Sequence, residues 1–172
     1  MAIVPDASPL IVLSKIERVE LLAKLYGKVL ITPWVWEEAV SIGKAMGARD
    51  ATLLEKAAQE FEFTRVRLKA AEKKLAEELR YSGTGSGEAE VLAVAKIRKA
   101  SAILDDKDAR MAALGLGISH VGTAAVLYEA FIGHFITYEE LLQLLEKLGK
   151  VAWISPELLA GIIRKAGEVK AK

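Results

Sequence analysis

Three carboxylates fall within four positions directly after an apolar run, in the stretch Ile103–Asp108, which reads ILDDKD. They belong to Asp105, Asp106 and Asp108. Aspartate is favoured just before a helix and in its first turn, so helix capping is one explanation of the pattern. A metal site is the other, because carboxylate oxygens are the ligands that hard divalent cations such as Mg²⁺ prefer.

Two acidic residues elsewhere in the chain favour the metal site. Asp6 follows the expected strand 2–4, and ligands of α/β proteins bind beyond the carboxyl ends of the strands, although a helix cap explains this residue equally well. Glu38 falls beside Ala39 on the apolar side of the expected helix 34–42, at ~100° per residue. A carboxylate on such a face is normally paired, hydrogen-bonded or bound to a cation. The alternative is a partly exposed position at the edge of the face.

The expected helix 88–99 offers two glutamates for one role. Glu88 shares a side of the helix with Val91 and Leu92, whereas Glu90 shares another side with apolar residues of its own. Both sides are equally apolar in the sequence. Periodicity therefore does not choose between the two carboxylates.

Two hydroxyl residues are secondary candidates. Ser8, two residues after Asp6, could orient that carboxylate or contact a substrate phosphate, but it also forms a suitable N-cap before Pro9. Thr123 follows the expected strand 118–121 and has the same two interpretations. Either residue can cap a helix and still face the edge of the sheet.

The composition excludes several other chemistries. The chain has 172 residues, enough for one domain with a substantial core, and no cysteine, which excludes thiolate metal sites and cysteine nucleophiles. His120 and His134 lie near no nucleophile and are expected to be structural. The net charge of +1 produces no global attraction to nucleic acid. The sequence shows no signal peptide or long apolar segment, so we expect a cytoplasmic protein without membrane contact.

The pattern of elements predicts an α/β fold. Short apolar runs alternate with helical patterns, which is typical of a mainly parallel sheet with helices on both faces. The expected strands are 2–4, 28–32, 61–66, 101–104 and 118–121. The expected helices are 10–16, 19–26, 34–42, 50–60, 69–80, 88–99, 106–114, 123–132, 138–148 and 156–166. The charged helix 69–80 is expected to be solvated, residues 43–47 to end the preceding helix, and residues 82–87 to form a loop.

Five segments together resemble the PIN-domain nucleases, and in particular their VapC-like prokaryotic subgroup. The segments are VPDASPLIVLSKI, VLITPWVWEEAV, GSGEAEVLAVAK, SAILDDKDAR and VGTAAVLYEAFIG, and the similarity continues to the C-terminal helices. Their order and spacing carry the resemblance. It implies a three-layer α/β/α fold with C-terminal helices. We expect the nuclease domain to span 1–150, with a helical insertion near 43–82, and a helical extension over 151–172 to pack on it.

The resemblance also assigns roles to acidic residues. The four acids that it implies for catalysis and for binding Mg²⁺ or Mn²⁺ are Asp6, Glu38, Glu88 and Asp106. At the third position this chain has Glu where most PIN nucleases have Asp, so the carboxylate reaches about one bond further. The secondary candidates are Asp105, Ser8 and Thr123.

The function that the resemblance implies is hydrolysis of RNA phosphodiester bonds by metal-activated water, often by a toxin that a small antitoxin protein blocks. Two alternatives stay open: a non-catalytic module that binds RNA or protein, and a receiver-like phosphoacceptor domain. A receiver would carry an acidic pair where this chain has only Asp6.

We also expect a homodimer or a groove for a partner helix. Trp34 and Trp36 lie about 200° apart on one helix and cannot both face one core; a covering C-terminal segment is the alternative explanation. The absence of Asn, with only two Gln beside many Lys and Glu, favours a thermophilic source.

Overall fold

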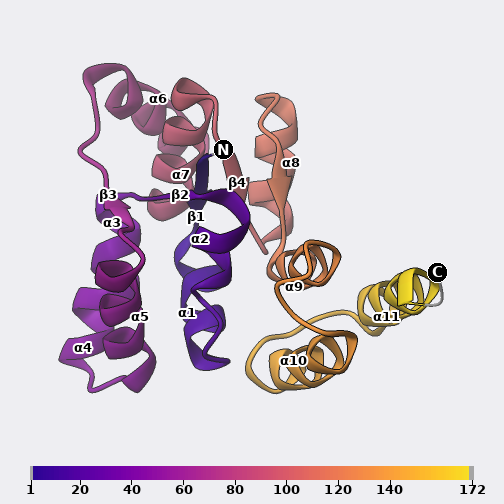
Figure 1. Ribbon diagram of the computed structural model, residues 1–172. Helices are drawn as coiled ribbons and strands as arrows, with labels where there is room; N and C mark the ends of the chain where they lie inside the picture. The colour runs from indigo at the N-terminus through magenta and orange to yellow at the C-terminus, as the bar shows by residue number, and fades with distance from the viewer. Residues whose placement is uncertain (1, 171–172) are drawn as a thin grey trace.

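The computed structural model describes residues 2–170 and confirms the expected α/β architecture (Figure 1). The strands of this part of the chain are β1 (Ala2–Pro5), β2 (Lys28–Ile31), β3 (Thr64–Arg65), β4 (Ser101–Ile103) and β5 (His120–Val121). They form one sheet in the order β3-β2-β1-β4-β5, in which every neighbouring pair is parallel. All five expected strands are therefore present, in a sheet that is entirely rather than mainly parallel.

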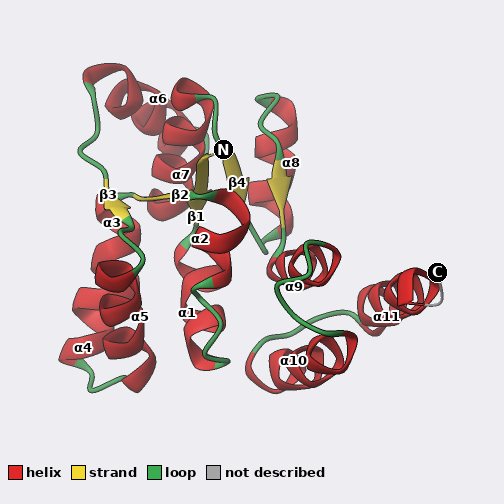
Figure 2. Ribbon diagram, viewed as in Figure 1, coloured by secondary structure: helices red, strands yellow, loops and turns green. Residues whose placement is uncertain are grey.

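Helices flank the short strands (Figure 2). They are α1 (Ala7–Lys15), α2 (Leu21–Tyr26), α3 (Pro33–Trp36), the π-helix η1 (Glu37–Ile42), α4 (Gly43–Ala45), α5 (Arg49–Glu60), α6 (Ala70–Tyr81), α7 (Ser86–Arg98), α8 (Lys107–Gly115), α9 (Thr123–Ile132), α10 (Tyr138–Val151) and α11 (Pro156–Lys170). Helix α7 packs against β1 and β4, whereas α2 packs against β1 and β2. Helices α6 and α11 lie at opposite ends of the molecule (Figure 1).

The main core centres on the sheet and on α7, and a second, small cluster of Ala76, Ala89 and Ala93 lies between α6 and α7. Ile3, Val4 and Ile103 of the middle strands are fully buried. Helix α7 is enclosed over two turns, and every residue from Ala89 to Ala95 is buried, because α6 covers the side of α7 that the strands leave free. The position of α7 is thereby fixed relative to the strand ends.

The carboxyl ends of β1 and β4 lie side by side. Pro5 pairs with Ile103 in the parallel register, and the backbone N–H of Asp6 donates to the carbonyl of Ile103 over 3.0 Å. The chain therefore leaves both strands at the same edge of the sheet. Asp6 and Asp105 follow these strands, so the topology brings residues 99 positions apart to one place.

The helix that was expected over 34–42 changes its hydrogen-bond pattern at Glu37, where the π-helix η1 begins. A π-helix closes its bonds between residues i and i+5, so the rotation per residue is smaller than in an α-helix. Ala39 and Val40 are buried, whereas Glu37 and Glu38 are exposed. The prediction that Glu38 lies within the apolar face was wrong, because it assumed the α-helical period throughout.

Two further boundaries differ from the prediction. The chain stays helical through α4 and turns only at Gly47, which has φ +74°. Gly43 does not break the helix, but it lets α5 approach, since a Cβ at this position would lie 2.7 Å from the Cβ of Ala51. Helix α7 begins at Ser86, inside the expected loop.

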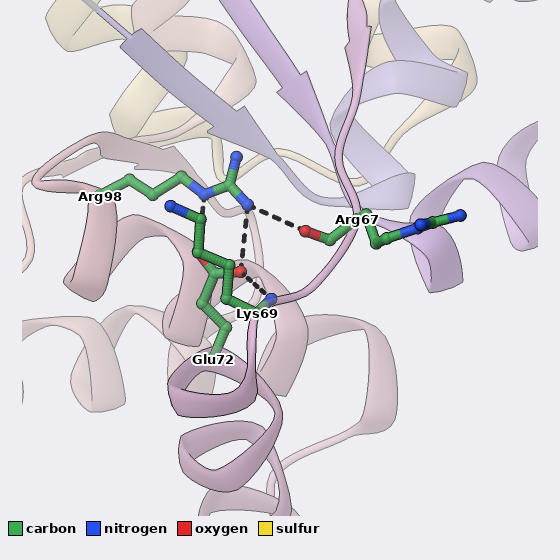
Figure 3. A network of polar contacts seen from close by, with 4 residues as sticks. All are labelled: Arg67, Lys69, Glu72 and Arg98. Carbon is green, nitrogen blue, oxygen red and sulfur yellow. Dashed lines mark hydrogen bonds and ion pairs between the residues drawn. The ribbon is translucent and has the colours of Figure 1, made fainter.

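The charged helix α6 is not simply solvated, which corrects the sequence-based expectation. Glu72 is fully buried and accepts two hydrogen bonds from the Arg98 guanidinium, at 2.6 and 3.0 Å, and one from the backbone N–H of Lys69 at 2.7 Å (Figure 3). Arg98 also donates to the carbonyl of Arg67 at 3.2 Å. The side of α6 that carries Glu72 and Ala76 thus packs against α7.

The two tryptophans of α3 have different surroundings. Trp36 is half-buried at the border of the core, with the guanidinium of Arg65 4.3 Å above its ring, whereas Trp34 is 48% exposed. Arg65 of β3 thus covers the ring of Trp36. A C-terminal segment had been one candidate for covering a tryptophan of this helix. No helix within residues 2–170 is long and apolar enough to span a bilayer.

Candidate functional site

Asp6 lies at the N-terminus of α1, directly after β1. It occupies the N-cap position, although its carboxylate makes no capping hydrogen bond. Ser8 lies inside the first turn of α1, so the N-cap interpretation of Ser8 was wrong. Burial raises the pKa of Asp6 from 3.8 to about 6; the N–H of Ala7 partly opposes this shift, and nearby negative charges add to it. These charges are those of Glu88, Glu38 and Asp105. The Asp6 carboxylate therefore lies among carboxylates.

Two of these carboxylates lie close to Gly87. A Cβ at this position would lie 3.5 Å from Asp6 Oδ1, 3.7 Å from Glu38 Oε2 and 3.1 Å from Trp34 Cδ1. Gly87 itself is buried in the first turn of α7. The absence of a side chain at Gly87 thus leaves room for the carboxylates of Asp6 and Glu38 beside the start of α7.

The structure separates the two glutamates that periodicity left unresolved. Glu90 is buried and accepts the backbone N–H of Trp34 over 3.0 Å, so it holds the start of α3 against α7. Burial raises the pKa of Glu88, the N–H of Gly85 partly opposes this, and negative charges raise it further. Those charges belong to Asp106, Asp108 and Glu38. Glu88 therefore faces the other acids, whereas Glu90 has a structural hydrogen bond.

Asp105 and Asp106 both hold helix N-termini. Asp105 accepts the backbone N–H of Thr123 at 2.8 Å and its hydroxyl at 2.6 Å, and thus fixes the start of α9. Oδ1 of Asp106 accepts the N–H groups of Asp108 and Ala109 at the start of α8. Both Asp106 bonds use the same oxygen. The capping interpretation of these aspartates therefore applies, and it leaves Oδ2 of Asp106 without a hydrogen bond to any described residue.

These residues form what we call the acidic site: Asp6, Glu38, Glu88, Asp105 and Asp106. None of their carboxylates forms an ion pair with another residue of the part of the chain from 2 to 170. Burial and neighbouring charges in this site raise the pKa of Asp6 and of Glu88. Within residues 2–170, however, no three carboxylates or imidazoles lie close enough together to form a complete metal-binding set. The donor set nevertheless suits Mg²⁺ or Mn²⁺, which need few protein oxygens and retain several waters.

The other candidates lie in different surroundings. Thr123 is buried on Asp105, whereas Ser8 is exposed in the first turn of α1. His120 makes a contact of 3.3 Å with the carbonyl of Ile118. Sequence reasoning missed Gly87 as a functional position. The signal for it was present, because a glycine in the first turn of an apolar helix indicates close approach of another group.

Comparisons with known proteins agree with this fold. A family model described as DUF3368: PIN domain matches residues 2–168. The PilT N-terminus domain protein from the hyperthermophilic archaeon Sulfolobus solfataricus P2 has a similar structure, with a TM-score of 0.50 and 22% sequence identity. The similarity covers 73% of this chain and 90% of that one. The search of curated proteins finds no match.

Proposed function

Because this chain belongs to the DUF3368 family of PIN domains, and PIN domains are a family of nucleases that generally bind divalent metal, we propose that it is a ribonuclease dependent on Mg²⁺ or Mn²⁺. The proposed metal ligands and catalytic groups are Asp6, Glu38, Glu88 and Asp106. The observation that supports this most is the acidic site itself. Its carboxylates lie at one edge of the sheet and form no ion pair with a described residue, and burial together with the neighbouring negative charges raises the pKa of Asp6 and of Glu88.

The chemistry follows from this charge. When bound, a divalent ion supplies a positive charge beside a phosphate and a water of lowered pKa. The chain has no cysteine, and neither histidine belongs to the acidic site, so the carboxylates themselves carry the proposed reaction. Asp6 and Glu38 meet beside Gly87, and Thr123 fixes the orientation of Asp105. Asp106 and Glu88 each use one oxygen for a backbone N–H and keep the other for a ligand.

The test compares RNA cleavage by matched carboxylate variants. With Mg²⁺ or Mn²⁺ present, wild-type protein should cleave single-stranded RNA, and Asp6→Asn and Glu38→Gln should cleave it much more slowly. Glu37→Gln is the control for Glu38→Gln. Glu37 is the exposed neighbour in η1, and it is not among the charges that raise the pKa of Asp6 or of Glu88. Cleavage by Asp6→Asn at the wild-type rate would overturn the proposed site.

A second candidate function is non-catalytic RNA binding by the same fold. It is favoured by the finding that no three metal-ligating side chains of residues 2–170 form a complete set. This alternative predicts RNA binding without cleavage in any divalent metal. Membership in the PIN-domain family removes the receiver-like alternative.

The proposal extends to protein partners. A small antitoxin that covers the acidic site would have to present a cation to it, because its carboxylates have no basic partner in the described part of the chain. A homodimer is supported by the exposed apolar side chains of Trp34, Ile42 and Met46 along α3, η1 and α4. Sedimentation of wild-type protein and of Met46→Glu tests the dimer, since a charge at its interface should yield monomers.

A further inference from the structure

A cavity of about 500 Å³ lies beside the acidic site. Its lining includes Asp105, Ser8 and Thr123, together with Val151–Ser155, which comprise the last residue of α10 and the connection to α11. Asp105 belongs to both places, because it follows β4 at the edge of the sheet where Asp6 follows β1, and its side chain borders the cavity. Pockets that bind small ligands have about 300–1,000 Å³, so one nucleotide is of suitable size.

Arg110 supplies the positive charge of this cavity. It is the one basic side chain among the described residues that line it. A Cβ at Gly122 would lie 3.2 Å from Asp105 Oδ1 and 3.8 Å from a terminal guanidinium nitrogen of Arg110, so both groups border the same glycine. Arg110 forms no ion pair with another residue of the described chain. Its guanidinium is thus available to an anion next to the carboxylates.

Trp153 supplies an aromatic surface at the same cavity. It lies in the connection between α10 and α11 and is 89% exposed, although its neighbour Ile154 packs against the core. The fold therefore holds the backbone of this connection while the indole stays in solvent. Aromatic side chains in such positions stack on unpaired bases.

We propose that this cavity binds one nucleotide of a single-stranded RNA next to the phosphate at the acidic site. Arg110 contacts a backbone phosphate, and Trp153 stacks on the base. The inference rests on the function proposed above in taking RNA as the ligand. The guanidinium of Arg110 supports an anionic ligand, because it is the one cation among the described residues that line the cavity and it forms no ion pair with any of them. The apolar wall formed by Val12, Leu148 and Ile154 suits the flat, poorly hydrated face of a base.

The test separates the base from the backbone of the ligand. Binding of a fluorescent 12-residue RNA of mixed sequence, and of a matched oligomer of base-free ribose phosphates, is measured by anisotropy in EDTA. Trp153→Ala should weaken binding of intact RNA by about 5- to 100-fold and leave the base-free oligomer unaffected, because only stacking is lost. Trp153→Phe should restore most of the affinity.

Arg110→Gln should weaken both oligomers and reduce the slope of log affinity against log salt by about 0.7, which corresponds to one phosphate contact. Two controls that lie outside the cavity should change neither ligand: Tyr81→Ala, a 95% exposed aromatic of α6, and Arg164→Gln, an exposed arginine of α11.

The outcomes distinguish the two proposals. If the wild type cleaves RNA but Trp153→Ala binds intact RNA normally, or loses both oligomers equally, the nucleotide pocket is wrong and the nuclease proposal stands. If no metal supports cleavage but the base-dependent loss occurs, the nuclease proposal fails and the pocket stands. Absence of RNA binding in EDTA, together with absence of cleavage in any divalent metal, overturns both and leaves a protein partner as the occupant of the cavity.

Discussion

The two ends of helix α7 differ in whether a nearby carboxylate has a basic partner. At its C-terminal end, Arg98 forms two hydrogen bonds to the buried Glu72, whose pKa is lowered chiefly by that contact. At its N-terminal end, Glu88 lies near other carboxylates, and the pKa values of Glu88 and Asp6 are raised by burial and by these like charges. The carboxylate at the C-terminal end of α7, that of Glu72, therefore forms an ion pair, whereas those at the N-terminal end, of Glu88 and Asp6, form none with a described residue.

The difference indicates which carboxylates stabilise the fold and which reduce its stability. A paired buried acid contributes to structure, because removing either partner leaves a charge without compensation. Acids that repel one another destabilise the chain until a cation binds, which is typical of functional sites.

Cleavage should distinguish the two ends most strongly. Asp6→Asn should lower the rate of metal-dependent RNA cleavage by about 10²–10³-fold, because it removes a charge next to the reacting phosphate and metal. Glu72→Gln should retain the wild-type rate at temperatures where it is folded. Single-turnover assays on both variants measure the cleavage rate. An equal loss of rate in the two variants would contradict the proposed difference between the two ends of α7.

Glu72→Gln, which should retain cleavage, should instead lose stability. Glu72→Gln should lower the free energy of unfolding by about 3–5 kcal/mol at pH 7, because Arg98 keeps its charge and loses its buried partner. Urea denaturation followed by circular dichroism gives this value. The pKa of Glu72 is lowered in the fold, so the ionised carboxylate stabilises above its ordinary pKa of 4.5, and this contribution is lost as pH falls through the lowered value. The variant should approach the wild type in acid.

Asp6→Asn should stabilise the metal-free protein above pH 6. The pKa of Asp6 is raised from 3.8 to about 6, so ionisation costs the folded state about 3 kcal/mol above pH 6. This cost develops as pH rises from 3.8 to 6 and is absent below 3.8. Thermal melts in EDTA across this range should show the advantage of the variant appearing with pH. An advantage of the same size at pH 3.5 would contradict the assignment to ionisation.

The smallest effect concerns the link between the acidic site and α9. Thr123→Val keeps the shape of the side chain but removes the 2.6 Å hydrogen bond from its hydroxyl to Asp105. We expect a loss of about 1–2 kcal/mol in unfolding free energy, since a hydrogen bond to a charged acceptor contributes about this much. RNA cleavage should fall less than tenfold, because the N–H of Thr123 still holds the carboxylate. A loss as large as that of Asp6→Asn would place Thr123 among the catalytic groups.

The strands and most helices could be predicted from local patterns, because each apolar run has the period of its element. Three features of the site could not. The π-helical bonds of η1 leave no mark in the apolar period, so the surroundings of Glu38 were predicted incorrectly. The choice between Glu88 and Glu90 depends on the N–H of Trp34, 56 residues away. The cavity is lined both by Asp105 and by Trp153, which are 48 residues apart in the chain, so local patterns do not predict it.

Soaking crystals of the protein in Mn²⁺ tests the central idea most directly, because anomalous scattering locates the ion without reference to activity. We expect an anomalous peak within bonding distance of carboxylate oxygens of Asp6 and of at least one of Glu38, Glu88 and Asp106. Mn²⁺ bound only elsewhere, or no peak beside Asp6 at a concentration that supports cleavage, would contradict it.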